Sequence, residues 1–141
     1  MIHTIKNIIL VLILMVNFSY AELVLIVHKD SPIKHISVKH LQKIYENKSK
    51  TWAHGGSIIR TSLRKGENHR NFCNILGKNT TQLKRFWKKQ VFTGRGPSLK
   101  TYSSQKSLIE YISTHENSLG YVDSSIDTSL VKVIKIQRVL P

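Results

Sequence analysis

Apolar and polar positions follow one another along this chain in short blocks, and the blocks differ in their period. Residues 23–27 form an unbroken apolar run, which is typical of a strand covered on both faces. In residues 131–136, lysines separate the apolar positions, which predicts a half-exposed edge strand because lysine discourages edge-to-edge pairing. Two more strands are predicted at 57–63 and 119–122, with an extended segment at 99–102.

Between these strands, apolar residues recur at the spacing of an amphipathic helix. The predicted helices cover residues 38–45, 72–76, 83–91 and 108–112. Each follows a residue whose side chain can accept from an early helical N–H: Ser37, Asn68, Thr80 or Thr81, and Ser103 or Ser104. Gly77 is a natural residue to end the second helix. The order of strand 23–27, helix 38–45 and strand 57–63 predicts a parallel, right-handed βαβ unit, and hence an α/β domain with helices on both faces of its sheet.

The N-terminal segment has the pattern of a secretory signal peptide. Residues 8–16 are wholly apolar, and Ser19 and Ala21 are small residues at the positions that a signal peptidase reads. We expect cleavage after Ala21, so that residues 1–21 are a signal peptide and residues 22–141 form the mature domain in the periplasm. The apolar run is too short to span a bilayer comfortably. A retained N-terminal anchor is the alternative.

The charge balance points to an anionic partner. The 141 residues include 22 Lys and Arg but only 8 Asp and Glu, a formal charge of +14 with a pI near 10.1. Loss of Lys6 with the signal leaves +13. Phosphate, anionic lipid, nucleic acid or an acidic protein would all suit this excess. Because export conflicts with a nuclear or cytosolic role, we expect no nucleic-acid partner.

Several classes of reactive site have no matching pattern. The histidines form no HExxH motif, and Cys73 is the only cysteine, so that a CxxC motif and an internal disulfide are impossible. The sequence also contains no GxSxG, SxxK or Walker A motif. We therefore expect no metal, no cofactor and no enzymatic activity. The apolar neighbours of Cys73 predict a buried thiol, with a reactive thiol or an intermolecular bridge as the alternatives.

Two loops carry the residue types that bind anions. The first, Arg64–Arg70, follows a predicted strand and precedes a predicted helix, where unpaired N–H groups and partial positive charge favour an anion. The second, Thr93–Gly96, places Arg95 between two glycines after a basic helix. A capped helix start and an ordinary tight turn are the alternatives. The candidate anion-binding residues are Arg64, Gly66, Asn68, His69, Arg70, Thr93, Gly94, Arg95 and Gly96.

The order of these pieces resembles the small phosphate-ABC-transporter substrate-binding-like proteins, which are single-lobe relatives of the type II periplasmic binding proteins. The resemblance rests on segments spread over nearly the whole mature chain: Val38–Tyr45, Trp52 with His54-Gly55-Gly56, His69–Cys73, Phe86–Gly96 and Leu119–Val122. It implies a single-lobe, three-layer domain with a short, mostly parallel sheet.

In full-length relatives, phosphate lies between two lobes and contacts a serine-glycine-threonine turn at a helix start, preceded by an arginine. The corresponding stretch here is Arg64 to His69, in which Arg64 stands for the arginine and the triplet is missing. The resemblance implies a non-enzymatic binder of phosphate or a similar oxyanion, with an ABC permease or a membrane sensor as a further partner. The alternative is a basic envelope-interaction or sensory accessory module that binds anionic lipid, polysaccharide or an acidic protein.

Overall fold

The computed structural model describes residues 22–138, so the predicted signal peptide lies outside the described residues. A six-stranded sheet has the order β2-β6-β1-β5-β3-β4. Its strands are β1 (Leu23–Val27), β2 (His35–Ser37), β3 (Ile59–Leu63), β4 (Lys100–Tyr102), β5 (Ser118–Asp123) and β6 (Lys132–Gln137). The pairs β2–β6, β3–β4 and β3–β5 are parallel, whereas β1 is antiparallel to both β5 and β6.

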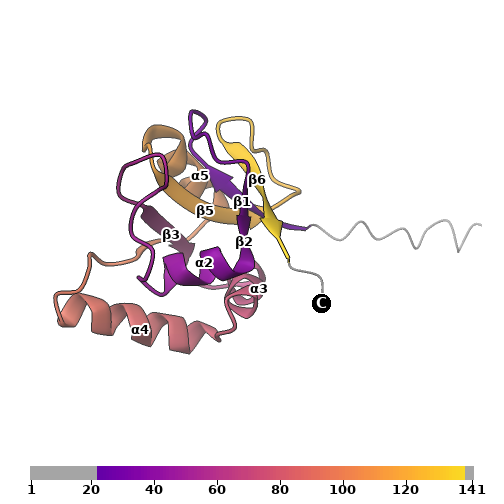
Figure 1. The fold of residues 1–141 in the computed structure, drawn as a ribbon. Coiled ribbons are helices and arrows are strands. Elements are labelled where there is room, and N and C mark those ends of the chain that lie inside the picture. Colours follow the sequence, from indigo (N-terminus) through magenta and orange to yellow (C-terminus); the bar gives the residue numbers. More distant parts are fainter. Residues whose placement is uncertain (1–21, 139–141) are drawn as a thin grey trace, which may run out of the picture.

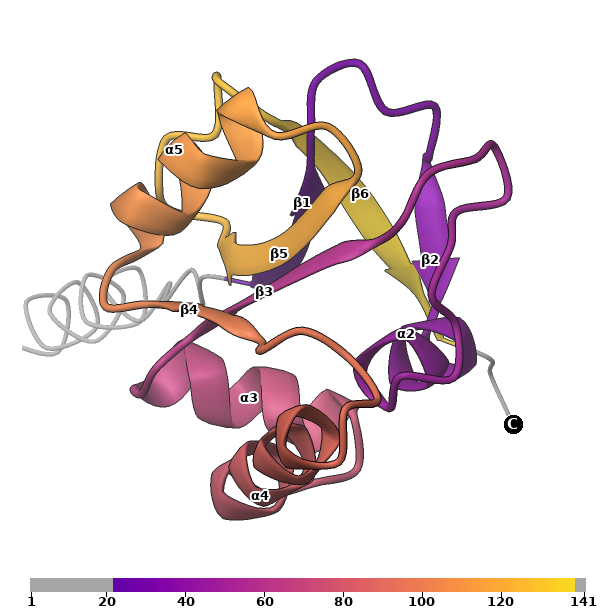
Figure 2. The same cartoon turned by 90° about the vertical axis from the view of Figure 1, so that its left-hand side faces the viewer.

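Helices cover both faces of this sheet, as predicted. They are α2 (Val38–Tyr45), α3 (Glu67–Ile75), α4 (Thr80–Phe92) and α5 (Gln105–Thr114). Helix α5 lies on one face and α2, α3 and α4 lie on the other, which gives three layers (Figures 1 and 2). Among residues 22–138, no helix combines the length and the apolar character needed to cross a bilayer.

The core joins the helical layers to the sheet through aromatic contacts. The ring of Phe72 on α3 stacks on Tyr121 of β5 with 3.8 Å between centroids, and its other side meets the edge of Tyr45 from α2 at 4.9 Å. On the opposite face, a Cβ on Gly120 would lie 2.7 Å from side-chain atoms of Leu108 and Ile112. Gly120 therefore allows α5 to pack closely on β5.

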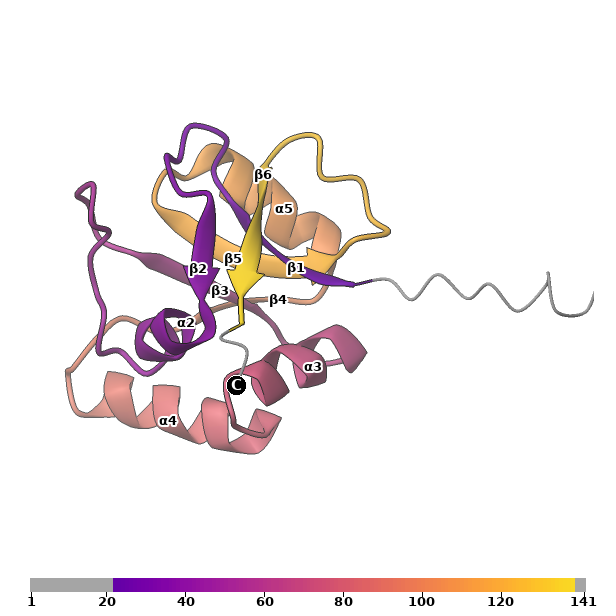
Figure 3. The ribbon, with the colours of Figure 1, turned by 45° about the vertical axis from the view of Figure 1, so that its right-hand side comes forward.

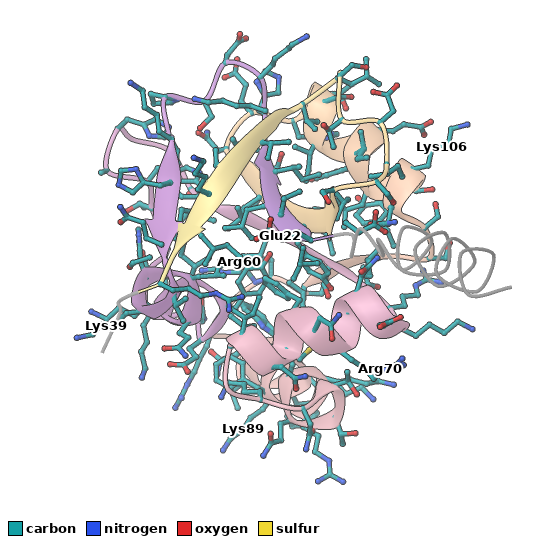
Figure 4. The ribbon with its side chains drawn as sticks, turned by 90° about the vertical axis from the view of Figure 1, so that its right-hand side faces the viewer. Glu22, Lys39, Arg60, Arg70, Lys89 and Lys106 are labelled. Carbon is teal, nitrogen blue, oxygen red and sulfur yellow. The ribbon has the colours of Figure 1, made fainter. Side chains whose placement is uncertain are left out.

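The buried Arg60 fixes the end of α2. Its guanidinium donates to the backbone oxygens of Ile44 and Ser49, the latter at 2.9 Å, and lies 5.1 Å from the ring centroid of Trp87. Figure 4 shows this side chain in the interior of the molecule. The buried Arg60 cation is thus satisfied by backbone oxygens at and after the negative end of α2. It forms no ion pair with a carboxylate in the described part of the chain.

Two predictions about the sheet are wrong, and one strand was missed. Strands β1 and β3 do not form a parallel unit, because β5 lies between them and runs antiparallel to β1. The parallel strands that α2 connects are β2 and β3, and β2 was missed because it has only three residues. Strand β6 is not at an edge, since its first half pairs with β1 and its second half with β2 (Figure 3).

The predicted helix ends are partly confirmed. Ser37 and Ser104 cap α2 and α5, and Gly77 follows α3 with a φ of 74°. Helix α4 is capped by Asn79, which forms a capping box with Gln82, so the prediction of Thr80 or Thr81 is wrong. Asn68 does not cap α3, whose N-cap is Gly66.

Candidate anion-binding site

Helix α3 begins without a side-chain cap. Its N-cap is Gly66, with φ 102° and ψ 176°, and its first helical hydrogen bond runs from Arg70 N to Gly66 O. Within residues 22–138, no hydrogen bond satisfies the N–H groups of the next three residues, Glu67 to His69. The other three described helices are capped by Ser37, Asn79 and Ser104. The start of α3 therefore offers free N–H groups and partial positive charge, as predicted for this loop.

Arg64 lies between the end of β3 and the start of α3, at the edge of the molecule that we call the rim. Its backbone N donates to Tyr102 O at 3.0 Å, and its Nε lies 3.5 Å from Thr101 Oγ1 on β4. The side chain is exposed, and so is Glu67 in the first turn of α3. The Glu67 carboxylate suits the positive end of the helix, and an incoming anion would have to compete with it.

The Asn68 amide is already engaged in a polar cluster. Its Nδ2 donates to Asp123 Oδ2 at 3.0 Å and to Gln105 Oε1 at 3.3 Å, which ties α3 to β5 and α5. The Ser125 hydroxyl first, and then Gln105 and Asn68, lower the pKa of Asp123 to about 2. The prediction that Asn68 caps α3 is therefore wrong: Gly66 is the N-cap, and the Asn68 side chain donates to Asp123 and Gln105 instead.

His69 lies in a buried polar cluster below the rim. Its Nδ1 is 2.6 Å from Tyr121 Oη and 3.3 Å from Ser62 Oγ, while Cys73 Sγ is 3.7 Å from Nε2. Burial lowers the pKa of His69 and raises the pKa of Cys73 to about 11. The prediction of a buried thiol is confirmed, and at neutral pH this thiol is protonated and unreactive.

A groove of about 890 Å³ runs from this rim along α4. Arg64 and His69 line one part of it, and residues from both ends of α4 line its length. The opposite wall comes from Ser98, Leu99 and Thr101, at the start of β4. Its charged lining side chains are all basic: Arg64, Lys84 and Lys88. The described residues contain no cluster of three or more His, Cys, Asp or Glu side chains placed to hold a metal ion.

The second predicted loop, Thr93–Gly96, is the closed end of α4. The N–H groups of Gly94 and Arg95 donate to Val91 O at 3.1 Å and Gln90 O at 2.8 Å, which is the Schellman pattern. The Thr93 hydroxyl donates to Lys89 O at 2.6 Å. These donors are therefore used inside the helix end, where the partial charge is negative.

The two predicted loops do not meet. The start of α3 and the end of α4 lie on different sides of the molecule in Figures 2 and 3. Arg64 and His69 line the groove, whereas its lining includes no residue of the Thr93–Gly96 turn and neither Gly66 nor Arg70. In Figure 4, the side chain of Arg70 points away from the body of the protein. The prediction that both loops converge on one ligand is wrong, and within the described residues the start of α3 is where three consecutive backbone N–H groups stay open.

Sequence reasoning missed the residues that form the rest of the groove. Lys84, Lys88 and Thr101 were not among the candidate anion-binding residues. One signal could have found them: the chain has no acidic residue between Glu67 and Glu110, and it has nine basic residues in that interval. A long basic stretch of sequence without acidic residues was therefore detectable, although the groove was not.

Comparison with known proteins agrees with this architecture. The family model described as the PBP superfamily domain matches residues 13–138. The chain belongs to the PBP superfamily. No curated protein matches it in sequence.

The solved structures with similar folds include proteins named for phosphate transport or phosphate binding. An ABC-type phosphate transport receptor from Vibrio cholerae has a TM-score of 0.65 at 14% identity, over 82% of this chain and 46% of that one. A phosphate ABC transporter substrate-binding protein from Clostridium perfringens, solved with bound phosphate, has a TM-score of 0.66 at 21% identity. The match covers 82% of this chain and 45% of that one. PstS from Borrelia burgdorferi has a TM-score of 0.62 at 13% identity, over 86% and 49%. The PBP domain described here thus spans less than half of each of these chains.

Proposed function

We propose that this PBP-superfamily protein is a non-enzymatic binder of phosphate or a similar oxyanion, exported to the periplasm. The observation that carries the proposal is the uncapped start of α3 beside Arg64. The N–H groups of Glu67, Asn68 and His69 would donate to the anion, and the guanidinium of Arg64 would add a full positive charge. An ABC permease or a membrane sensor would be the downstream partner.

Three further features support an anion at this position. Gly66 has no side chain that could occupy the open N–H groups, and a Cβ built on it meets no atom within 4 Å, so the approach is open. The groove beside it has no acidic lining residue. Solved proteins with similar folds are named for phosphate binding or transport. Because the rim is exposed to solvent on this single lobe, we expect weak binding.

The site assignment can be tested with a matched pair of arginine variants. Calorimetry with inorganic phosphate should show one-site binding that Arg64→Gln weakens by about threefold to tenfold, as expected for an exposed charged hydrogen bond. Arg95→Gln removes the same charge from the closed end of α4 and should leave the affinity within about twofold after correction for salt. An equal loss in both variants would indicate a general charge effect and contradict the assignment.

The acid-free stretch of sequence favours a second candidate function. Residues 68–109 contain Arg70, Lys78, Lys84, Arg85, Lys88, Lys89, Arg95, Lys100 and Lys106 and no acidic residue. A basic module that docks on an anionic envelope component would use these charges collectively. Its binding should weaken steeply as ionic strength rises and should respond to Arg95→Gln as strongly as to Arg64→Gln. The same arginine pair therefore separates the two functions.

A further inference from the structure

The groove beside the proposed phosphate position is larger than a small inorganic ion requires. Its volume of about 890 Å³ lies in the range of pockets that hold organic ligands, roughly 300–1,000 Å³. The lining runs from Thr80 to Phe92, so the groove extends along the whole of α4, a length of about 20 Å for its 13 residues. Phosphate bound near Arg64 would leave most of this space to water.

One end of the groove is polar, and along α4 the lining combines apolar side chains with Lys84 and Lys88. The polar end carries Arg64 and Thr101, next to the open start of α3. Beyond it, the walls include Leu83, Trp87, Val91 and Leu99. Val91 is 45% exposed and Phe92 is 93% exposed, so the far end keeps large apolar side chains in contact with water. Such an apolar surface is a candidate for binding.

The charges around the groove select for an anionic occupant. Lys84 and Lys88 stand one helical turn apart on α4, and they are on the groove with Arg64. None of these three cations forms an ion pair within the described part of the chain. An occupant with a strongly anionic end and an uncharged apolar remainder would be complementary to both parts of the groove.

We propose that the groove binds a phosphate monoester with an extended apolar group, as a single molecule. The phosphate would lie at the Arg64 end, in the position of the proposed function on which this inference rests. The apolar group would lie along α4 toward Val91, Phe92 and Leu99, the apolar lining side chains that keep exposed surface. The concave shape favours one enclosed molecule over the flat surface of a bilayer.

Calorimetry with a series of alkyl phosphates tests this inference. Inorganic phosphate and the methyl, butyl and hexyl monoesters are compared at concentrations where all stay monomeric. Affinity should rise along the series by up to about fourfold for each methylene that leaves water. Val91→Ser should reduce this rise and leave inorganic phosphate binding unchanged. Val133→Ser is the matched control, because Val133 is 44% exposed on β6, away from the groove lining.

The outcomes separate this inference from the proposed function. If inorganic phosphate binds and the alkyl chains add nothing, the inference is overturned and the proposed function stands. If hexanol binds as tightly as hexyl phosphate, or if both valine variants behave alike, the groove assignment is overturned. Binding to vesicles of anionic phospholipid without binding of the monomeric esters also overturns it, in favour of a membrane surface. If no phosphate compound binds, both proposals fail.

Discussion

The start of α3 and the end of α4 each place a glycine with positive φ beside basic residues, but their hydrogen bonding is opposite. Gly66 opens α3 and leaves three N–H groups without acceptors among the described residues. Gly94 closes α4, and its N–H and that of Arg95 are both used. An arginine near a glycine thus indicates an anion site only where the helix begins. At the end of a helix, the same residues complete the helix and meet a negative partial charge.

Side chains and backbone groups from other elements also hold the second half of α4. Within the described residues, no such group bonds the free N–H groups at the start of α3. Trp87 donates from Nε1 to Tyr45 O at 3.1 Å. Asn47 donates from Nδ2 to Gln90 Oε1 at 3.0 Å and to Arg95 O at 3.1 Å. The comparison therefore predicts that changes at the end of α4 leave phosphate binding unchanged, whereas changes at the start of α3 weaken it.

The largest expected effect is on Trp87. Trp87→Ala should lower the free energy of unfolding by roughly 3–5 kcal/mol, because it removes a buried aromatic side chain, its hydrogen bond and its contact with Arg60. Urea titration followed by circular dichroism measures this change. Trp87→Phe keeps most of the packing and should lose less. A loss well below 1 kcal/mol for Trp87→Ala would mean that α4 is not anchored as described.

Asn47→Ala should have the next largest effect. It leaves the Gln90 side chain and the Arg95 carbonyl without this donor, and we expect a loss of about 1–3 kcal/mol. Asn71→Ala, an exposed asparagine on α3, is the matched control and should change stability by less than about 0.5 kcal/mol. Phosphate affinity should stay unchanged in both variants. A drop in affinity for Asn47→Ala alone would place the ligand near the end of α4.

A pair of glycine variants sharpens the comparison directly. Gly66 has φ 102° and ψ 176°, a region that is almost exclusive to glycine, so Gly66→Ala should cost roughly 1–3 kcal/mol. Gly94, with φ 69°, is in the left-handed helical region, and Gly94→Ala should cost about 1 kcal/mol. Only Gly66→Ala should also weaken phosphate binding. Thermal unfolding and calorimetry on both variants check this, and equal affinities would contradict it.

The smallest expected effect is a pH dependence of stability from His69. Burial lowers its pKa in the folded state, while the unfolded value is about 6.5. As pH falls below about 6.5, the unfolded chain therefore takes up a proton that the folded chain does not, and stability decreases until the folded-state pKa is passed. Urea midpoints at pH 8 and pH 5.5 should differ more in the parent protein than in His69→Gln. If the urea midpoint shifts equally between the two pH values in both proteins, His69 does not contribute to the pH dependence of stability.

The local pattern of the sequence predicted most elements of the fold. The apolar run of β1, the helical spacing of α2, α4 and α5, and the caps Ser37 and Ser104 depend on neighbouring residues, and all are present in the structure. The strand order depends on pairing between distant segments. A three-residue strand such as β2 is defined by its partner β6 and carries no periodic signal of its own.

The candidate site could be predicted only in part, for the same reason. The α3 loop was found because a strand followed by a basic, glycine-containing helix start is a local pattern. The closed state of Thr93–Gly96 depends partly on Asn47, which is more than forty residues away in sequence. The engagement of Asn68 likewise depends on Gln105 and Asp123. Contacts of this range have no signature in a single sequence.

The most direct test of the account follows the backbone N–H groups themselves. In an NMR titration of the ¹⁵N-labelled protein with inorganic phosphate, the signals of Glu67, Asn68 and His69 should shift progressively and to the same saturation point. Those of Gly94 and Arg95 should not move beyond the change seen with equal ionic strength of sodium chloride. Shifts at Gly94 and Arg95 with none at the start of α3 would contradict the account.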